Sequence, residues 1–174
     1  YEFKKTDIAA IRIWDVKQIV GVADMKLSND LKDSIVAYSL GSCIGLVIYD
    51  PQARVGGILH YMLPDSSVDK SKAQVNPFMF ADTAIPKLFE QSDNMGADRT
   101  RLQIYIAGGA EIMNQASLFN IGKNNVMAVE KAFSKNQVSI HKQAVGGSAN
   151  RTIRLEIATG DVYLKTAGST EEKL

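Results

Sequence analysis

The sequence is poor in the residues that bind metals or form disulfides. It has one cysteine and two histidines among 174 residues. A structural zinc site needs a full set of such ligands, and neither a CxxC pair nor an HExxH motif is present, so we predict no metal. A single cysteine also excludes a disulfide within the chain.

Motifs that bind cofactors or nucleic acids are missing as well. There is no GxxxxGK[ST] loop and no GxGxxG turn, and the glycine pairs at 108–109 and 146–147 fit tight turns. Basic and acidic residues nearly balance, at 20 Lys+Arg against 19 Asp+Glu, and no long basic run occurs. We therefore predict no cofactor and no nucleic-acid partner.

Long apolar runs are also absent. The longest, residues 44–49, is far too short to cross a bilayer, and the N-terminal stretch lacks the apolar segment of a signal peptide. We expect a cytoplasmic protein without direct membrane insertion. Since 45% of the residues are apolar and 22% are charged, the chain can enclose the core of one ordinary domain.

The apolar periodicity indicates both strands and helices. Strands are expected over residues 19–25, 34–38, 44–49, 55–62, 102–107, 138–144, 152–157 and 162–164. Helical spacing predicts helices over 78–95 and 124–134, with Pro86 as a possible kink in the first. Residues 64–77 are expected to form a loop and residues 171–174 a frayed end. These patterns predict a single α+β domain.

One pair of residues suggests chemistry. Cys43 lies in the run LGSCIG at 40–45, and His60 follows 17 positions later. An adjacent imidazole can accept the proton of a thiol and so activate it as a nucleophile. Residues 50–53 have turn chemistry, which predicts a β-hairpin between the two. A turn centred on residues 51 and 52 would place Cys43 and His60 directly opposite, with Cβ atoms about 4.5–5.5 Å apart, whereas a slip of one residue would put them on opposite faces.

The alternative is that both residues are structural. Free cysteines are commonly buried as small apolar groups, and a lone histidine is often a hydrogen-bonded structural residue. The glycine-flanked position and the matched spacing keep the catalytic alternative open beside this one. The second histidine, His141, has no comparable partner and is expected on the surface or in a strand.

A series of short motifs supports a more specific hypothesis. They are LGSC at 40–43, DP at 50–51, VGG at 55–57, HYMLPD at 60–65, ADTA at 81–84, AGGA at 107–110, NIG at 120–122 and GG at 146–147. In this order they resemble the bacterial chemotaxis family CheD, the chemoreceptor glutamine deamidases, over most of residues 18–166. Each motif alone is weak, but together they are specific.

The resemblance implies a fold, a site and a reaction. The fold is a three-layer β/β/α arrangement shared with the cytotoxic necrotizing factor toxins, formed by residues 17–166 between an N-terminal extension (1–16) and a C-terminal tail (167–174). Cys43 and His60 fall on the catalytic pair. The reaction is hydrolysis of a glutamine side-chain amide in a chemoreceptor helix to glutamate and ammonia through a thioester. Backbone N–H groups near Gly41, Ser42 and Cys43 are the expected oxyanion donors.

One position departs from the family pattern. The family usually has a threonine six residues before the cysteine, where this chain has Ala37, and a methyl group cannot orient an imidazole. We expect a backbone carbonyl to take this role, or Ser39 if it shares the strand face of Ala37.

The resemblance leaves alternatives of function open. It also implies binding to a CheC-type phosphatase, so the chain could be a catalytically weak adaptor that binds receptors and CheC. A receptor methylesterase would use the same Cys/His pair on an ester. Residues 66–76 follow the His60 strand, and they either border the substrate groove or form a solvated connector.

Overall fold

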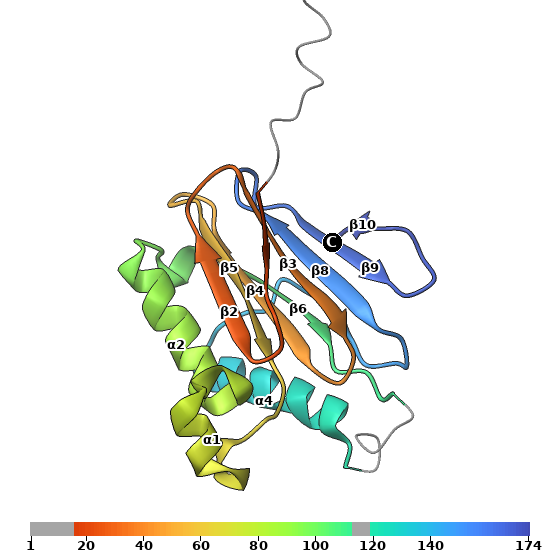
Figure 1. Ribbon diagram of the computed structural model, residues 1–174. Coiled ribbons are helices and arrows are strands. Elements are labelled where there is room, and N and C mark those ends of the chain that lie inside the picture. The colour runs from red at the N-terminus through yellow and green to blue at the C-terminus, as the bar shows by residue number, and fades with distance from the viewer. Residues whose placement is uncertain (1–15, 113–118) are drawn as a thin grey trace, which may run out of the picture.

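The computed structural model describes residues 16–112 and 119–174, which fold into two β-sheets and flanking helices (Figure 1). The strands are β1 (Val16–Ile19), β2 (Asp24–Ser28), β3 (Asp33–Leu40), β4 (Ile44–Asp50), β5 (Val55–Tyr61), β6 (Gln103–Gly108), β7 (Lys142–Val145), β8 (Arg151–Glu156), β9 (Val162–Thr166) and β10 (Glu172–Lys173). The helices are α1 (Lys70–Val75), α2 (Ala81–Asn94) and α4 (Ile121–Lys135), with short 3-10 segments η2 (Ser66–Val68), η3 (Pro77–Met79) and η4 (Arg99–Arg101).

In the described part of the chain, each sheet has five strands and is mixed. The first has the order β1-β3-β8-β9-β10 and the second β2-β5-β4-β6-β7. In the first sheet β1 runs parallel to β3, and in the second β6 runs parallel to β7. The predicted mixture of strands and helices in an α+β domain is confirmed.

The core consists of two apolar layers, one on each face of the second sheet. Alternate side chains of β4 and β5, such as Val47 and Ile58, pack against the first sheet. Their neighbours, such as Leu46 and Leu59, pack against α2 and α4. Figure 1 shows these two helices on the side of the second sheet that faces away from β8 and β9. The order of layers is therefore sheet, sheet, helices.

Pro86 lies inside α2, which continues through it. The residue is exposed, so the hydrogen bond that its missing N–H would make is lost on the solvent side of the helix. The helix begins at Ala81 rather than at the predicted residue 78, because residues 77–79 form a separate 3-10 segment.

Two predictions about irregular segments are wrong. Residues 64–77 contain η2 and α1, whose N-termini are capped by the side chains of Asp65 and Asp69. Residues 171–174 are not frayed, because β10 pairs with β9 and the Leu174 N–H donates to the Val162 carbonyl at 2.9 Å. None of the helices among the described residues is long and apolar enough to span a membrane.

Asp50 closes the turn between β4 and β5. Its buried carboxylate accepts hydrogen bonds from the backbone N–H groups of Gln52 (2.9 Å), Ala53 (3.1 Å) and Asp98 (2.8 Å). The guanidinium of Arg101 lies 2.6 Å from the same carboxylate. Burial by itself would raise the pKa of Asp50, but these donors hold it well below its ordinary value.

We expect Asp50→Asn to lower the free energy of unfolding by about 2 kcal/mol, because Arg101 then loses its charged partner. The pKa of Asp50 is lowered on folding, so its contribution is present above the ordinary value of 3.8 and is lost as the pH falls below it. Urea unfolding at several pH values measures both effects. Asp93→Asn is the matched control, since the exposed Asp93–Arg99 pair contributes about 0.5 kcal/mol or less. Equal costs for the two variants would contradict the role of Asp50.

Candidate active site

His60 is buried in β5, between β2 and β4. It is 1% exposed, and its backbone pairs with Asp24 on one side and Gly45 on the other. Its side chain shares the strand face of Ile58, which packs between the two sheets. Opposite His60, Gly45 has no Cβ because a methyl group of Leu40 fills the layer there and would lie 2.8 Å from that atom.

Cys43 directly precedes β4, diagonally across the hairpin from His60. The predicted hairpin is confirmed, but its register is wrong by two residues, since Ile44 pairs with Tyr61 and Gly45 with His60. A shift of two keeps each side chain on its face. Extending the alternation of β4 by one residue puts Cys43 on the face of His60, in a diagonal relation whose typical separation is about 7–8 Å.

The register differs because the turn has four residues, 51–54, instead of two. The Asp50 side chain binds the N–H groups of residues 52 and 53, and Arg54 adopts a positive φ of 53° before β5 begins. Such side-chain binding of backbone N–H groups is typical of aspartate before a turn.

The backbone that carries Cys43 is held by hydrogen bonds to three successive carbonyls, those of Gly41, Ser42 and Cys43. Their donors are the N–H of Ala110 to Gly41 (2.8 Å), the side-chain amide of Asn125 to Ser42 (2.9 Å) and the N–H of Gly109 to Cys43 (2.9 Å). This bend therefore has a fixed conformation in spite of its glycine and serine.

Glycines allow the close approach of neighbouring backbone at this bend. A Cβ at Gly41 would lie 2.7 Å from the side chain of Ile112. A Cβ at Gly108, whose φ is 111°, would clash with the Cys43 carbonyl oxygen. These two positions explain two of the glycine-containing motifs, LGSC and AGGA.

Burial keeps both candidate catalytic groups uncharged at neutral pH. It raises the pKa of the Cys43 thiol above 9.0, although the backbone N–H of Cys43 itself lowers it to a lesser extent. Burial lowers the pKa of His60 below 6.5, opposed by smaller effects of the Val20 carbonyl and the Asp24 charge. The resting pair is therefore a thiol and a neutral imidazole.

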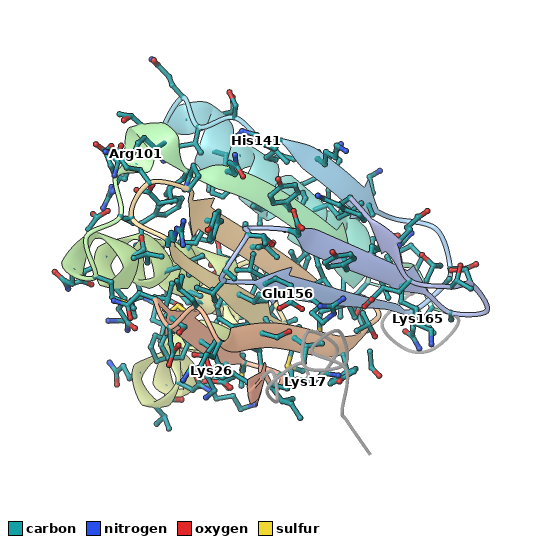
Figure 2. The ribbon with its side chains drawn as sticks, turned by 90° about the horizontal axis from the view of Figure 1, so that it is seen from above. Lys17, Lys26, Arg101, His141, Glu156 and Lys165 are labelled. Carbon is teal, nitrogen blue, oxygen red and sulfur yellow. The ribbon has the colours of Figure 1, made fainter. Side chains whose placement is uncertain are left out.

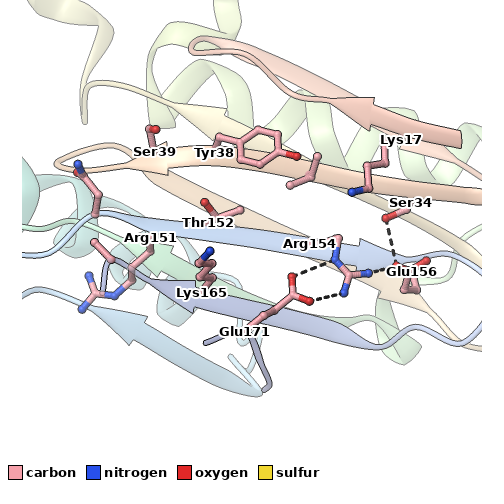
Figure 3. A pocket seen from close by; sticks show the side chains of 13 residues that line it. Lys17, Ser34, Tyr38, Ser39, Arg151, Thr152, Arg154, Glu156, Lys165 and Glu171 are labelled. Carbon is pink, nitrogen blue, oxygen red and sulfur yellow. Dashed lines mark hydrogen bonds and ion pairs between the residues drawn. The ribbon is translucent and has the colours of Figure 1, made fainter. Parts of the chain in front are cut away.

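The hydroxyl expected from Ser39 is not available to His60. Ala37 is buried between the sheets, but an irregularity in the β3–β8 pairing follows it, and Ser39 has a positive φ of 55°. Ser39 is exposed and lines a groove of about 590 Å³ on the outer face of the first sheet (Figure 3). The expectation that it shares the face of Ala37 is wrong, because the bulge reverses the alternation.

The backbone carbonyl of Val20 raises the pKa of the His60 imidazole. Neither ring nitrogen of His60 makes a hydrogen bond within the part of the chain that the structure describes. The carbonyl is thus a nearby acceptor without a formed hydrogen bond.

His141 lies elsewhere, as expected for a surface residue. It is exposed, and its Nδ1 accepts a hydrogen bond from the Ile104 N–H at 3.2 Å. It directly precedes β7, at the opposite edge of the second sheet from β2, which neighbours His60. Figure 2 shows this separation, with His141 and Lys26 on opposite sides of the view.

Asn125 of α4 is a residue that the sequence patterns do not single out. It is fully buried on the helix face that also carries Val129 and Phe133. Its side-chain amide donates to the carbonyls of Ser42 and Met62, each at 2.9 Å. The sequence does contain a signal for this residue. Asn125 lies four residues before Val129 on the apolar face of the predicted helix, and a buried asparagine needs a polar partner.

The uncharged pair predicts how the thiol reacts with iodoacetamide. Plotted against pH, the alkylation rate should show a shoulder above the pKa of His60, where the neutral imidazole takes the thiol proton. It should rise at least about tenfold further as the thiol itself ionises, with a pKa above 9.0. Mass spectrometry follows the reaction at one site, since Cys43 is the only cysteine. Rapid alkylation that persists down to about pH 5 would instead indicate a resting thiolate–imidazolium pair.

Comparisons with known proteins agree on one family. A family model described as CheD chemotactic sensory transduction matches residues 62–166. A protein of Syntrophus aciditrophicus, named probable chemoreceptor glutamine deamidase CheD 1, is 47% identical over 156 residues, which cover 90% of this chain and 98% of that protein. A probable chemoreceptor glutamine deamidase CheD of Solibacter usitatus is 49% identical over 154 residues, which cover 88% of this chain and 91% of that protein.

A more distant relative from Clostridium botulinum, with the same name, is 37% identical over 158 residues, or 88% of this chain and 96% of that protein. The residues matched by the family model begin after His60, so this match includes neither Cys43 nor His60. Similarity of this extent, together with the family model, establishes that the chain belongs to the CheD chemotactic sensory transduction family.

Proposed function

We propose that this protein is a chemoreceptor glutamine deamidase in which Cys43 is the nucleophile and His60 the general base and acid. The main support is the 47–49% sequence identity to proteins of that name along nearly their whole length. The hairpin register supports it, since extending the alternation of β4 by one residue puts the cysteine on the face of the buried His60. The catalytic domain is residues 17–166, with the fold of the cytotoxic necrotizing factor toxins, and the protein acts in the cytoplasm.

The mechanism starts from the uncharged pair. Cys43 Sγ attacks the carbon of the substrate carboxamide while the thiol proton passes to His60. The carbonyl oxygen becomes an oxyanion, stabilised by N–H groups of the bend from Gly41 to Cys43.

Collapse of the tetrahedral intermediate breaks the carbon–nitrogen bond. The imidazolium of His60 delivers its proton to the departing nitrogen, and ammonia leaves a thioester on Cys43. Water, activated by the neutral His60, then attacks the thioester carbonyl and restores the thiol. The product is a glutamate side chain on the receptor helix, which replaces a neutral amide with a charge and so changes helix packing.

The Val20 carbonyl is proposed to orient the imidazole during the reaction, in place of the missing threonine. It raises the pKa of His60, as an acceptor for a ring N–H does. Its hydrogen bond would form when His60 becomes protonated during the reaction, because the charged ring has donors at both nitrogens.

The segment 66–76 is proposed to border the substrate site. It begins four residues after Met62, which directly follows the end of β5. The side chain of Asn76 donates a hydrogen bond to the carbonyl of Ala23, and the N–H of Ala23 donates to the carbonyl of His60. Val75 is 87% exposed, and Met62 is also exposed, which gives an apolar contact for an amphipathic receptor helix. A CheC-type phosphatase is the second proposed partner.

Mass spectrometry of a receptor cytoplasmic fragment tests the reaction. Wild-type protein should convert specific glutamines to glutamates, and Cys43→Ala should reduce the rate by at least about a thousandfold because the thioester cannot form. Ser39→Ala is the matched control and should retain the wild-type rate within about twofold, since Ser39 faces the outer groove. Conversion that survives Cys43→Ala would exclude Cys43 as the nucleophile.

The same experiment separates the alternative functions. Ala37 offers no hydroxyl, and the ring of His60 has no hydrogen-bond partner among the described residues, which favours a weakly catalytic adaptor as the second candidate. An adaptor would bind the receptor fragment equally well with and without Cys43→Ala and convert no glutamine. A methylesterase would release methanol from methylated receptor and leave glutamines unchanged.

We expect Val75→Asp to raise KM for the receptor fragment about tenfold, since it places a charge in the proposed apolar contact. The alkylation rate of Cys43 should not change, because the substitution is on the exposed surface and leaves Cys43 and His60 in place. Lys70→Ala with Lys72→Ala is the matched control, which changes the same short helix without its apolar residue. If neither variant alters KM, the segment is a solvated connector.

A further inference from the structure

Asn125 links the two segments that carry the candidate catalytic residues. Its Nδ2 donates to the carbonyl of Ser42, which precedes Cys43, and to the carbonyl of Met62, two residues after His60, at 2.9 Å in each case. Its backbone carbonyl accepts a hydrogen bond of 2.6 Å from the hydroxyl of Tyr61. One helical residue therefore contacts the chain beside both catalytic positions.

These hydrogen bonds begin where the β4–β5 ladder ends. The last backbone pair of the ladder is Ile44 with Tyr61, and the next pair in that register would be Cys43 with Met62. Beyond the last pair no ladder bond joins the two strand ends among the described residues. Asn125 replaces the missing ladder bonds with a bridge between Ser42 and Met62.

The chemistry of the bridge requires a primary amide. Both hydrogens of Nδ2 are used, one for each carbonyl, so the orientation of the amide is fixed. The Oδ1 atom is buried and has no hydrogen-bond partner among the described residues. An aspartate of the same shape has no hydrogen to donate, and an aliphatic side chain leaves both carbonyls unbound.

Other residues at the bend hold one segment only. Gly109 and Ala110 bind the carbonyls of Cys43 and Gly41 but make no hydrogen bond to the end of β5 within the described residues. Asn125 alone, among the side chains described at this bend, contacts the carbonyls on both sides.

We propose that Asn125 is a positioning residue that sets the separation between the Cys43 thiol and the His60 imidazole. The inference rests on the Cys43–His60 pair of the proposed function and adds the residue that holds the pair together. Asn125 acts through the backbone and does not touch the substrate.

The test is a double-mutant cycle between Asn125 and His60, read out as the rate of Cys43 alkylation by iodoacetamide near neutral pH. In the wild-type background His60→Gln should slow alkylation at least about tenfold, because the proton acceptor is lost. In the Asn125→Asp background the same change should slow it by about twofold or less, since the imidazole no longer reaches the thiol. Asn124→Asp is the control, an exposed neighbour in α4 that should leave the full effect of His60→Gln intact.

Asn125→Ser repeats the cycle with an uncharged side chain that folds more readily and still cannot bridge both carbonyls. Phe133→Leu lowers the stability of the same helix without touching the bridge, and it should keep the full effect of His60→Gln. Equal slowing by His60→Gln in all backgrounds would overturn the positioning role.

The readout needs no receptor, so it separates two kinds of failure. Absence of glutamine conversion would count against the proposed function while the coupling could still be measured. If His60→Gln has no effect on alkylation in the wild-type background, the pair does not exist and the positioning role falls with it.

Discussion

The antiparallel ladder between β4 and β5 determines the geometry of the candidate site. It runs from Ile44 paired with Tyr61 to Asp50 paired with Val55. At one end the buried carboxylate of Asp50 binds the turn and Arg101. At the other end, where the ladder stops, Asn125 joins the two chains. A change of one residue in this register would turn His60 away from the face of Cys43, so the chemistry depends on both ends of the hairpin.

The position of this hairpin in the middle layer also determines the charge state of the pair. The second sheet is covered on one face by the first sheet and on the other by α2 and α4, so a polar side chain on β5 is removed from water. Burial raises the pKa of Cys43 and lowers that of His60, and both shifts favour the uncharged forms. Such a site would create its thiolate only when a proton is transferred during the reaction, which protects the thiol from unwanted oxidation.

The sequence predicts the elements of this fold better than the details of the site. The β4–β5 hairpin follows from two apolar runs around DP, and α4 follows from its apolar spacing. The register of this hairpin cannot be predicted in the same way. The spacing of Cys43 and His60 fits a two-residue turn, whereas the Asp50 side chain stabilises a four-residue turn. The sequence also does not show which face of the sheet Ser39 lies on, since the bulge after Ala37 has no recognisable apolar pattern. In the sequence, Asn125 is only a polar residue on the apolar face of an amphipathic helix. Its role cannot be predicted, because its two carbonyl partners are far away in the sequence.

The central claim is that Cys43 forms a covalent intermediate with a receptor glutamine, and the most direct measurement is to trap that intermediate. The protein and a receptor cytoplasmic fragment are mixed, quenched in acid and examined by intact-mass and peptide mass spectrometry. We expect an adduct whose mass equals both partners less one ammonia, located on the peptide that contains Cys43 and absent in Cys43→Ala. Conversion of glutamine to glutamate without any adduct, at the same rate in Cys43→Ala, would contradict it.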